Sequence, residues 1–103
     1  MNYATYVIIF KALADETRLK IVKMLFDGEL CACIINENFN ITQPTLSYHM
    51  KTLCDSGLVN SRRDGTWMRY SINPESFQSF KELFDEFRQC EDHKQYCNCE
   101  EDC

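Results

Sequence analysis

The chain has 103 residues, of which 45% are hydrophobic, and this length suits one domain built around one core. A formal net charge of −5 argues at first against a nucleic-acid partner. The acidic excess lies in residues 74–103, which hold nine Asp and Glu against three Lys and Arg, whereas residues 1–73 hold seven Asp and Glu against eight Lys and Arg. No run of about 18 apolar residues and no secretion-signal pattern is present, so we expect a cytoplasmic protein without a membrane partner.

The first part of the chain predicts three helices. Apolar residues recur at spacings of three and four over residues 3–13, so the first helix should be mostly buried. Asp15 can cap a second helix, and Gly28 supplies its left-handed stop. A third, short helix is expected from near Glu29 to about Asn36.

The second part predicts a fourth helix, a hairpin and a last helix. Thr42 offers an N-cap hydroxyl, and Pro44 fits the first turn of the fourth helix. The pattern then changes to period two, with Asp64-Gly65 as a two-residue hairpin turn. Four aromatic residues share one face of the last helix: Phe77, Phe80, Phe84 and Phe87.

Two segments are therefore expected. Residues 1–90 should form one mainly α (α+β) domain, and residues 91–103 should form a cysteine-rich, acidic tail. The phenylalanine stripe exceeds what one copy can cover, which predicts a homodimer built from the first and last helices.

The fourth helix and the hairpin have the pattern of a DNA-binding unit. A wheel places Leu46, Met50 and Leu53 on one side and polar side chains on the other. A second helix of this kind can enter the major groove, while the tip of a hairpin wing contacts phosphates beside it. The residues expected to contact operator DNA are Gln43, Thr45, Ser47, Tyr48, His49, Lys51, Arg62 and Arg63.

Two alternatives remain open at this surface. His49 falls at the edge of the apolar face, so it could be a half-buried histidine bonded to a neighbour or a phosphate contact. The fourth helix alone could be an ordinary amphipathic surface helix, but the succession of helix, turn, helix and hairpin disfavours that interpretation.

The chain resembles the ArsR/SmtB family of metal-responsive repressors in five segments, which are residues 13–21 (LADETRLKI), 28–33 (GELCAC), 43–50 (QPTLSYHM), 56–59 (SGLV) and 62–70 (RRDGTWMRY). The resemblance covers about residues 7–73. It implies a homodimeric winged helix-turn-helix repressor that leaves double-stranded operator DNA when it binds its inducer.

Within that family, residues 29–33 resemble the arsenic-sensing cysteine motif. The motif usually continues to a third cysteine, and this chain has Asn36 at that position. The histidine and carboxylate pairs that zinc-sensing members carry on the last helix are replaced here by phenylalanines. The resemblance thus implies that Cys31 and Cys33 bind arsenite, with a third ligand from elsewhere or a different inducer.

Thiolate sulfur prefers soft metal and metalloid ions, so the cysteines predict an inducer of this kind. Seven cysteines against two histidines favour arsenite, with antimonite, cadmium, lead and zinc as other candidates. Cys31 and Cys33 would lie about 200° apart on a regular helix, so binding one ion would require the first turn to unwind. Alternatively, both thiols simply fill core space.

The remaining cysteines leave further possibilities open. Cys54 lies near the apolar face of the fourth helix and should be structural. The tail thiols could close over Cys31 and Cys33, form a second site, or belong to a solubilising end. These tail residues are Cys90, Cys97, Cys99 and Cys103.

Two rival functions use the same thiols. A winged-helix repressor could respond to thiol oxidation instead of a metal. The chain could instead be a metallochaperone or thiol oxidoreductase. However, it lacks the Cys-x-x-Cys motif of thioredoxin-like redox proteins, and this function would leave the fourth helix and the hairpin unexplained. No nucleophile, base and oxyanion-binding set can be assembled, so we do not expect an enzyme.

Overall fold

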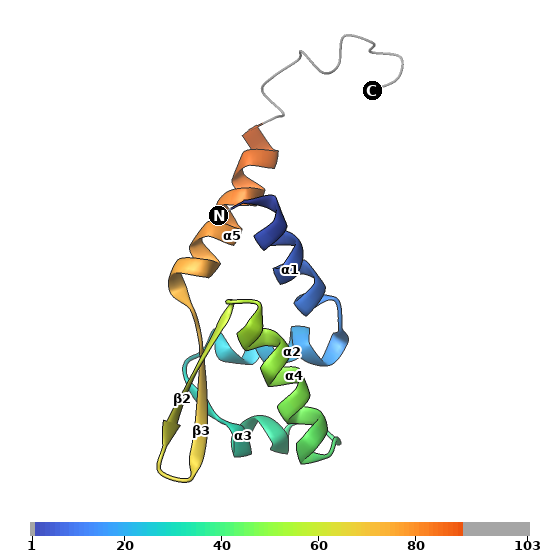
Figure 1. Ribbon diagram of the computed structural model, residues 1–103, viewed down its shortest axis with the longest axis vertical. Coiled ribbons are helices and arrows are strands. Elements are labelled where there is room, and N and C mark those ends of the chain that lie inside the picture. Colours follow the sequence, from blue (N-terminus) through green and yellow to red (C-terminus); the bar gives the residue numbers. More distant parts are fainter. Residues whose placement is uncertain (1, 90–103) are drawn as a thin grey trace.

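The computed structural model describes residues 2–89, which form a mainly helical chain with one small antiparallel sheet (Figure 1). The succession of two helices and a hairpin confirms the predicted winged helix-turn-helix class. Within this part of the chain, no helix is long and apolar enough to cross a membrane. The elements are α1 (Tyr3–Leu13), α2 (Glu16–Leu25), β1 (Leu30–Cys31), α3 (Ala32–Glu37), α4 (Gln43–Asp55), β2 (Val59–Asp64), β3 (Trp67–Ile72) and α5 (Pro74–Gln89).

Side-chain caps fix the starts of α2 and α4. Asp15 Oδ2 accepts a hydrogen bond from the Arg18 N–H at 3.0 Å, and Thr42 Oγ1 accepts one from the Thr45 N–H at 3.3 Å. After α4, Gly57 has a φ of +87°, which residues with a β-carbon rarely adopt. The predicted N-caps of α2 and α4 and the glycine that follows α4 are therefore confirmed.

The sheet contains one strand more than the sequence predicted. Its order is β1-β3-β2, and both pairs are antiparallel. Residues Leu30 and Cys31 are extended because they pair with Tyr70 and Arg69 of β3. The prediction that the third helix begins near Glu29 is therefore wrong, since α3 begins after these two residues.

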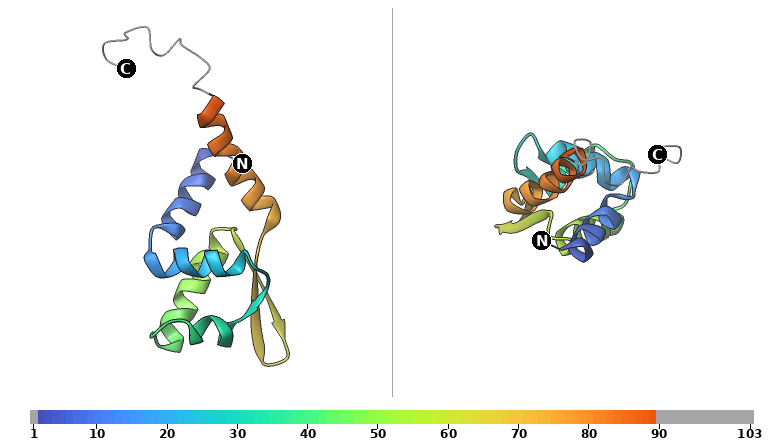
Figure 2. Two further views of the ribbon diagram at one scale, coloured as in Figure 1. Left: turned by 180° about the vertical axis from the view of Figure 1, so that it is seen from behind. Right: turned by 90° about the horizontal axis from the view of Figure 1, so that it is seen from above.

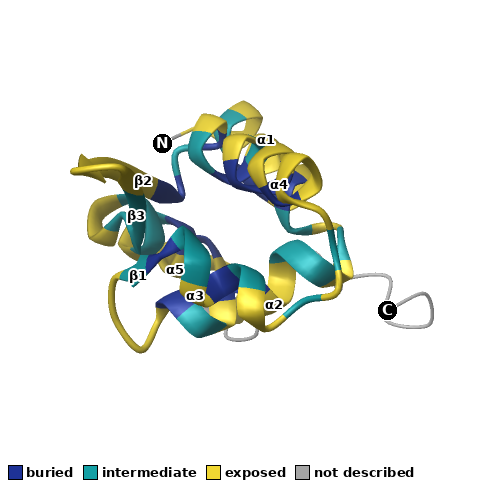
Figure 3. Ribbon diagram, turned by 90° about the horizontal axis from the view of Figure 1, so that it is seen from below, coloured by how far each residue is buried: buried dark blue, intermediate teal, exposed yellow. Residues whose placement is uncertain are grey.

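Side chains from α1, α2, α3 and α4 all contribute to the hydrophobic core. Figure 3 shows that buried positions of α2, α3 and α4 face one another, whereas the outer side of α4 and most of β2 are exposed. Leu46, Met50 and Leu53 are buried, as the helical wheel predicted. The large side chains with almost no exposed surface are Ile9, Ile21, Ile35, Met50, Leu53 and Leu58.

Helix α1 is less buried than predicted. Only Tyr6, Ile9 and Ala12 of this helix are buried, whereas Ile8 is 52% exposed and Phe10 is 42% exposed. Figure 2 shows α1 and α5 together at one end of the molecule, away from the hairpin. A single copy therefore covers one side of α1 and leaves the other side bare.

Candidate DNA interface and thiol site

The outward face of α4 carries polar side chains, as predicted. Its exposed side chains include Tyr48, which is 62% exposed. Lys51 is also exposed, and its Nζ lies 2.8 Å from Asp55 Oδ2 one turn further along the helix. The other exposed residues among the predicted DNA contacts of this helix are Gln43, Thr45 and Ser47.

His49 lies on the inner side of α4. It is 9% exposed, its Nδ1 lies 3.1 Å from Arg18 Nη1, and the same nitrogen lies 4.0 Å from Asp15 Oδ2. Hydrogen bonding by the Arg18 backbone N–H lowers the pKa of Asp15, and the charge of Arg18 adds to this effect. Of the two roles left open, the structure favours the half-buried histidine, so we remove His49 from the expected DNA contacts.

The hairpin of β2 and β3, which is the wing, carries three arginines, and two of them form ion pairs with carboxylates. Arg62 donates from Nε and Nη2 to Glu29, with both distances 2.8 Å, and Arg69 Nε donates to Asp64 at 2.8 Å. Hydrogen bonding by Arg62 lowers the pKa of Glu29. Arg63 is exposed and forms no ion pair within residues 2–89. Glu29 was missed by sequence reasoning because it pairs with a residue 33 positions away.

Cys31 and Cys33 lie together at the start of α3. Cys31 is the N-cap, with φ −75° and ψ 147°, and its sulfur accepts a hydrogen bond from the Cys33 N–H at 3.3 Å. The two Sγ atoms are 2.7 Å apart. The expectation that α3 must unwind to bring these sulfurs together is therefore wrong, because Cys31 precedes the helix instead of lying within it.

The two thiols ionise differently. A hydrogen bond from the Cys33 thiol lowers the pKa of Cys31, and the N–H groups of Cys33 and Ile34 and the charge of Arg69 act in the same direction. Donating that hydrogen bond raises the pKa of Cys33, and partial burial adds to the rise. The Cys31 thiol is therefore the more acidic of the two, and the thiolate is the form that binds soft ions.

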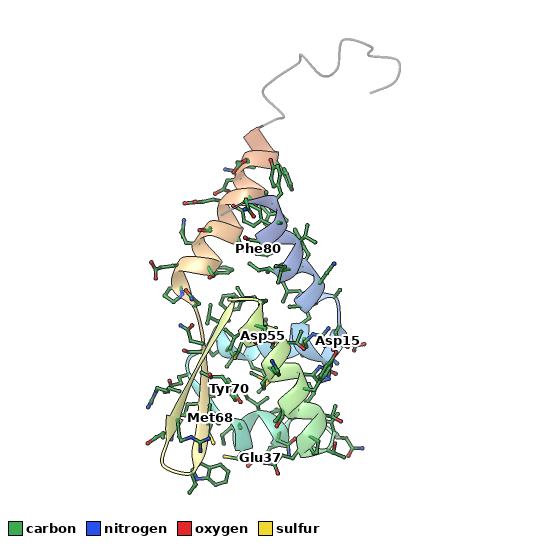
Figure 4. All side chains as sticks on the ribbon, in the orientation of Figure 1. Asp15, Glu37, Asp55, Met68, Tyr70 and Phe80 are labelled. Atoms are coloured by element: carbon green, nitrogen blue, oxygen red, sulfur yellow. The ribbon has the colours of Figure 1, made fainter. Side chains whose placement is uncertain are left out.

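A cavity of about 270 Å³ connects the thiol site to α4 and the wing. Cys33 and Asn36 line it from α3, Gln43 and Ser47 line it from α4, and Met68 lines it from β3. Figure 4 shows that Met68 and Tyr70 lie on the side of β3 that faces α3 and α4. The cavity was not predicted, since it depends on how the hairpin folds over the two helices.

The other cysteines do not join this site within the described chain. Cys54 is half-buried, and burial raises the pKa of its thiol, as expected of a structural residue. Within residues 2–89, no group of three His, Cys, Asp or Glu side chains could hold a metal ion. The predicted ligands Cys90, Cys97, Cys99 and Cys103 lie outside the described residues.

An aromatic cluster spans α1 and α5. Phe80 is buried, and its ring centroid lies 5.0 Å from that of Phe10 and 5.2 Å from that of Phe84. Phe84 is 46% exposed and Phe87 is 55% exposed. This bare apolar surface, continuous with the exposed side of α1, is consistent with the predicted dimer interface.

The chain is similar in sequence and fold to bacterial regulators. The family described as "Bacterial regulatory protein, arsR family" matches residues 15–61. The arsenical resistance operon repressor of Staphylococcus aureus is 48% identical over 73 residues, which cover 71% of this chain and 70% of that protein. The arsenical resistance operon repressor of Escherichia coli (strain K12) is 38% identical over 95 residues, which cover 91% and 81%.

Solved structures agree with this similarity. The crystal structure of a possible transcriptional regulator for arsenical resistance has a TM-score of 0.67 and 30% identity, with 75% of this chain and 80% of that chain covered. The crystal structure of an ArsR family transcriptional regulator has a TM-score of 0.81 over 90% of this chain and 96% of that chain. Its 24% identity supports the fold alone.

Proposed function

Since the chain belongs to the ArsR family of bacterial regulatory proteins, we propose that it is an arsenite-responsive repressor that binds operator DNA as a cytoplasmic homodimer. Membership makes the chain a DNA-binding, winged-helix transcriptional repressor and not an enzyme. The proposal adds that the thiolates of Cys31 and Cys33 bind the inducer. The observation that carries it is the pair of sulfurs 2.7 Å apart, in which Cys33 lines a cavity shared with α4.

Arsenite is the favoured inducer because of the ligands available. Two adjacent sulfurs, of which Cys31 has a lowered pKa, suit a soft ion, and antimonite, cadmium, lead and zinc are weaker candidates. Both the Staphylococcus aureus and the Escherichia coli relatives are named for arsenical resistance.

Inducer binding at the two thiols can change the DNA-binding surface without unwinding α3. Cys31 pairs with Arg69 of β3, and Arg69 is bonded to Asp64 at the tip of the wing. Cys33 shares its cavity with Gln43 and Ser47 of α4. An ion that holds both sulfurs can therefore shift the wing relative to α4. A coupling of about 1–3 kcal/mol would weaken operator binding roughly 5- to 150-fold.

The DNA-binding surface follows from the exposed side chains. We propose that α4 enters the major groove with Gln43, Thr45, Ser47, Tyr48 and Lys51, while Arg62 and Arg63 approach phosphates from the wing. A twofold dimer would set two such helices about one DNA turn apart. The operator should therefore be an imperfect inverted repeat.

Thiol oxidation is the second candidate, because two thiols in contact are also suited to react with an oxidant. Operator binding measured by fluorescence anisotropy separates the two candidates. Under a non-thiol reductant, arsenite should release the operator and the other ions should do so less effectively. If the reduced protein stays bound at saturating arsenite and is released by a two-electron oxidant alone, the redox function replaces the proposed one.

The polar face of α4 should set sequence preference. Tyr48→Phe or Thr45→Val is expected to reduce discrimination against single base changes by about 1–3 kcal/mol for each hydrogen bond to a base that the substitution removes. Thr52→Val is the matched control, because the Thr52 hydroxyl already donates to the Tyr48 carbonyl within the helix at 3.0 Å. Affinities for a panel of mutated operators provide the measurement. An unchanged preference in both variants would show that α4 is not the recognition helix.

The wing should contribute charge but little sequence information. Arg63→Ala is expected to lower the slope of log affinity against log salt by about 1, equally on all sequences. Arg62→Ala should have a smaller effect, because Glu29 already neutralises this side chain. Glu29→Gln is the complementary variant, since it frees Arg62 and should strengthen binding at low salt. A salt slope that is the same in all of these proteins would contradict the proposed wing contact.

A further inference from the structure

Asn36 carries a buried acceptor that nothing in the described chain satisfies. Its Oδ1 is the one buried side-chain oxygen or nitrogen among the described residues that has no hydrogen-bond partner. A buried polar atom left in this state costs free energy, so any donor that reached it would be stabilised.

Asn36 lies about one turn of α3 beyond Cys33. It follows Cys33 by three residues on α3, and such residues lie on the same face of a helix. Asn36 and Cys33 also line the same cavity. About 270 Å³ of space is available there, which exceeds the roughly 30 Å³ that one water molecule occupies in the liquid.

The chemistry of arsenite supplies the missing donor. Arsenous acid, As(OH)₃, reacts with two thiols by forming two As–S bonds and breaking two As–O bonds, and the two thiol protons leave with the two hydroxyls as water. One hydroxyl remains on arsenic and can donate a hydrogen bond. No third His, Cys, Asp or Glu within residues 2–89 is placed to displace it.

We propose that Asn36 Oδ1 accepts a hydrogen bond from the hydroxyl that stays on arsenic when Cys31 and Cys33 bind arsenite. This inference rests on the proposed function and makes Asn36 a specificity-determining residue for it. The site then has two sulfur ligands and one oxygen ligand. It favours ions that keep a hydroxyl, such as arsenite and antimonite, over cadmium and lead.

Two trivalent arsenicals separate this role from a structural one. Phenylarsine oxide also forms two As–S bonds, releasing one water, but it keeps a phenyl group where arsenite keeps a hydroxyl. Asn36→Leu removes the acceptor with little change in size. We expect this variant of the full chain to bind arsenite about 2- to 12-fold more weakly and to bind phenylarsine oxide no more weakly than the parent.

Asn38→Leu is the control, because this exposed amide caps the end of the same helix through the Ile34 carbonyl. It should alter neither affinity. Equal weakening of both arsenicals by Asn36→Leu, or no weakening of arsenite, would overturn the inference while leaving an arsenite-released repressor intact.

X-ray absorption by arsenic in the full chain, with one arsenite per protomer, gives an independent readout. We expect two sulfur ligands and one oxygen ligand. Three sulfur ligands would mean that another cysteine displaces the hydroxyl, and the role of Asn36 would be refuted. An absence of arsenic–sulfur bonds would instead refute the proposed function itself.

Discussion

Replacing Phe84 and Phe87 together by aspartate is expected to convert the protein to a monomer and to lower operator affinity about 10²- to 10⁴-fold. Both rings lie on the surface and continue a cluster that begins with buried Phe80, so the substitutions place charge on the proposed interface without opening the core. A monomer would hold one half-site at a time. Sedimentation and operator titration measure the two effects.

The matched control adds a carboxylate to the other side of α5. Gln78 is exposed and bonds to Glu82 at 3.3 Å, so Gln78→Asp adds charge on a polar face. This variant should remain dimeric and bind its operator. A double phenylalanine variant that stays dimeric at micromolar concentration would place the interface elsewhere.

Cys31→Ser is expected to abolish release by arsenite while leaving operator affinity within about twofold of the parent. Serine is close in size to cysteine but supplies an oxygen, which is a poor ligand for a soft ion, and the site would keep a single thiol. Cys31 lies away from the exposed face of α4, so DNA contacts should be unaffected. The measurement is operator release as a function of arsenite concentration.

Cys54→Ser serves as the control, because this half-buried thiol belongs to α4 and not to the thiol site. It should be released by arsenite as readily as the parent. If Cys31→Ser is released at the parent's arsenite concentration, the sensor is not at α3, and Cys90, Cys97, Cys99 and Cys103 become the leading candidates.

Local signals in the sequence predicted most of the fold. A cap such as Asp15 or Thr42 acts within three residues, so it can be identified from neighbouring letters. The hairpin was also identified, but its turn was predicted one residue too early, because Asp64 pairs with Trp67 and the two loop residues are Gly65 and Thr66. Periodicity likewise placed Leu46 on the buried side of α4.

Pairings between distant residues could not be predicted. Cys31 is extended because it pairs with Arg69 of β3, and this long-range contact decides that the two sulfurs meet without any distortion of α3. The pairing of Glu29 with Arg62 and the contact of His49 with Arg18 likewise join elements that are far apart in sequence. These contacts changed the expected mechanism and the expected DNA contacts.

The exposure of α1 could not be predicted for a different reason. Its apolar residues have the pattern of a buried helix, and periodicity alone does not say whether the cover comes from the same chain or from a second copy. Exposed Ile8 and Phe10 agree with cover from a second copy, as the dimer prediction requires.

The most direct test of the central claim is a thermodynamic cycle between arsenite and operator DNA. The affinity of the reduced, full-length protein for arsenite is measured free and bound to operator, and its affinity for operator is measured with and without arsenite. Because coupling between two ligands is reciprocal, both affinities should fall by the same factor, roughly 5- to 150-fold. Arsenite that binds Cys31 and Cys33 equally well in the free and operator-bound protein would contradict the account.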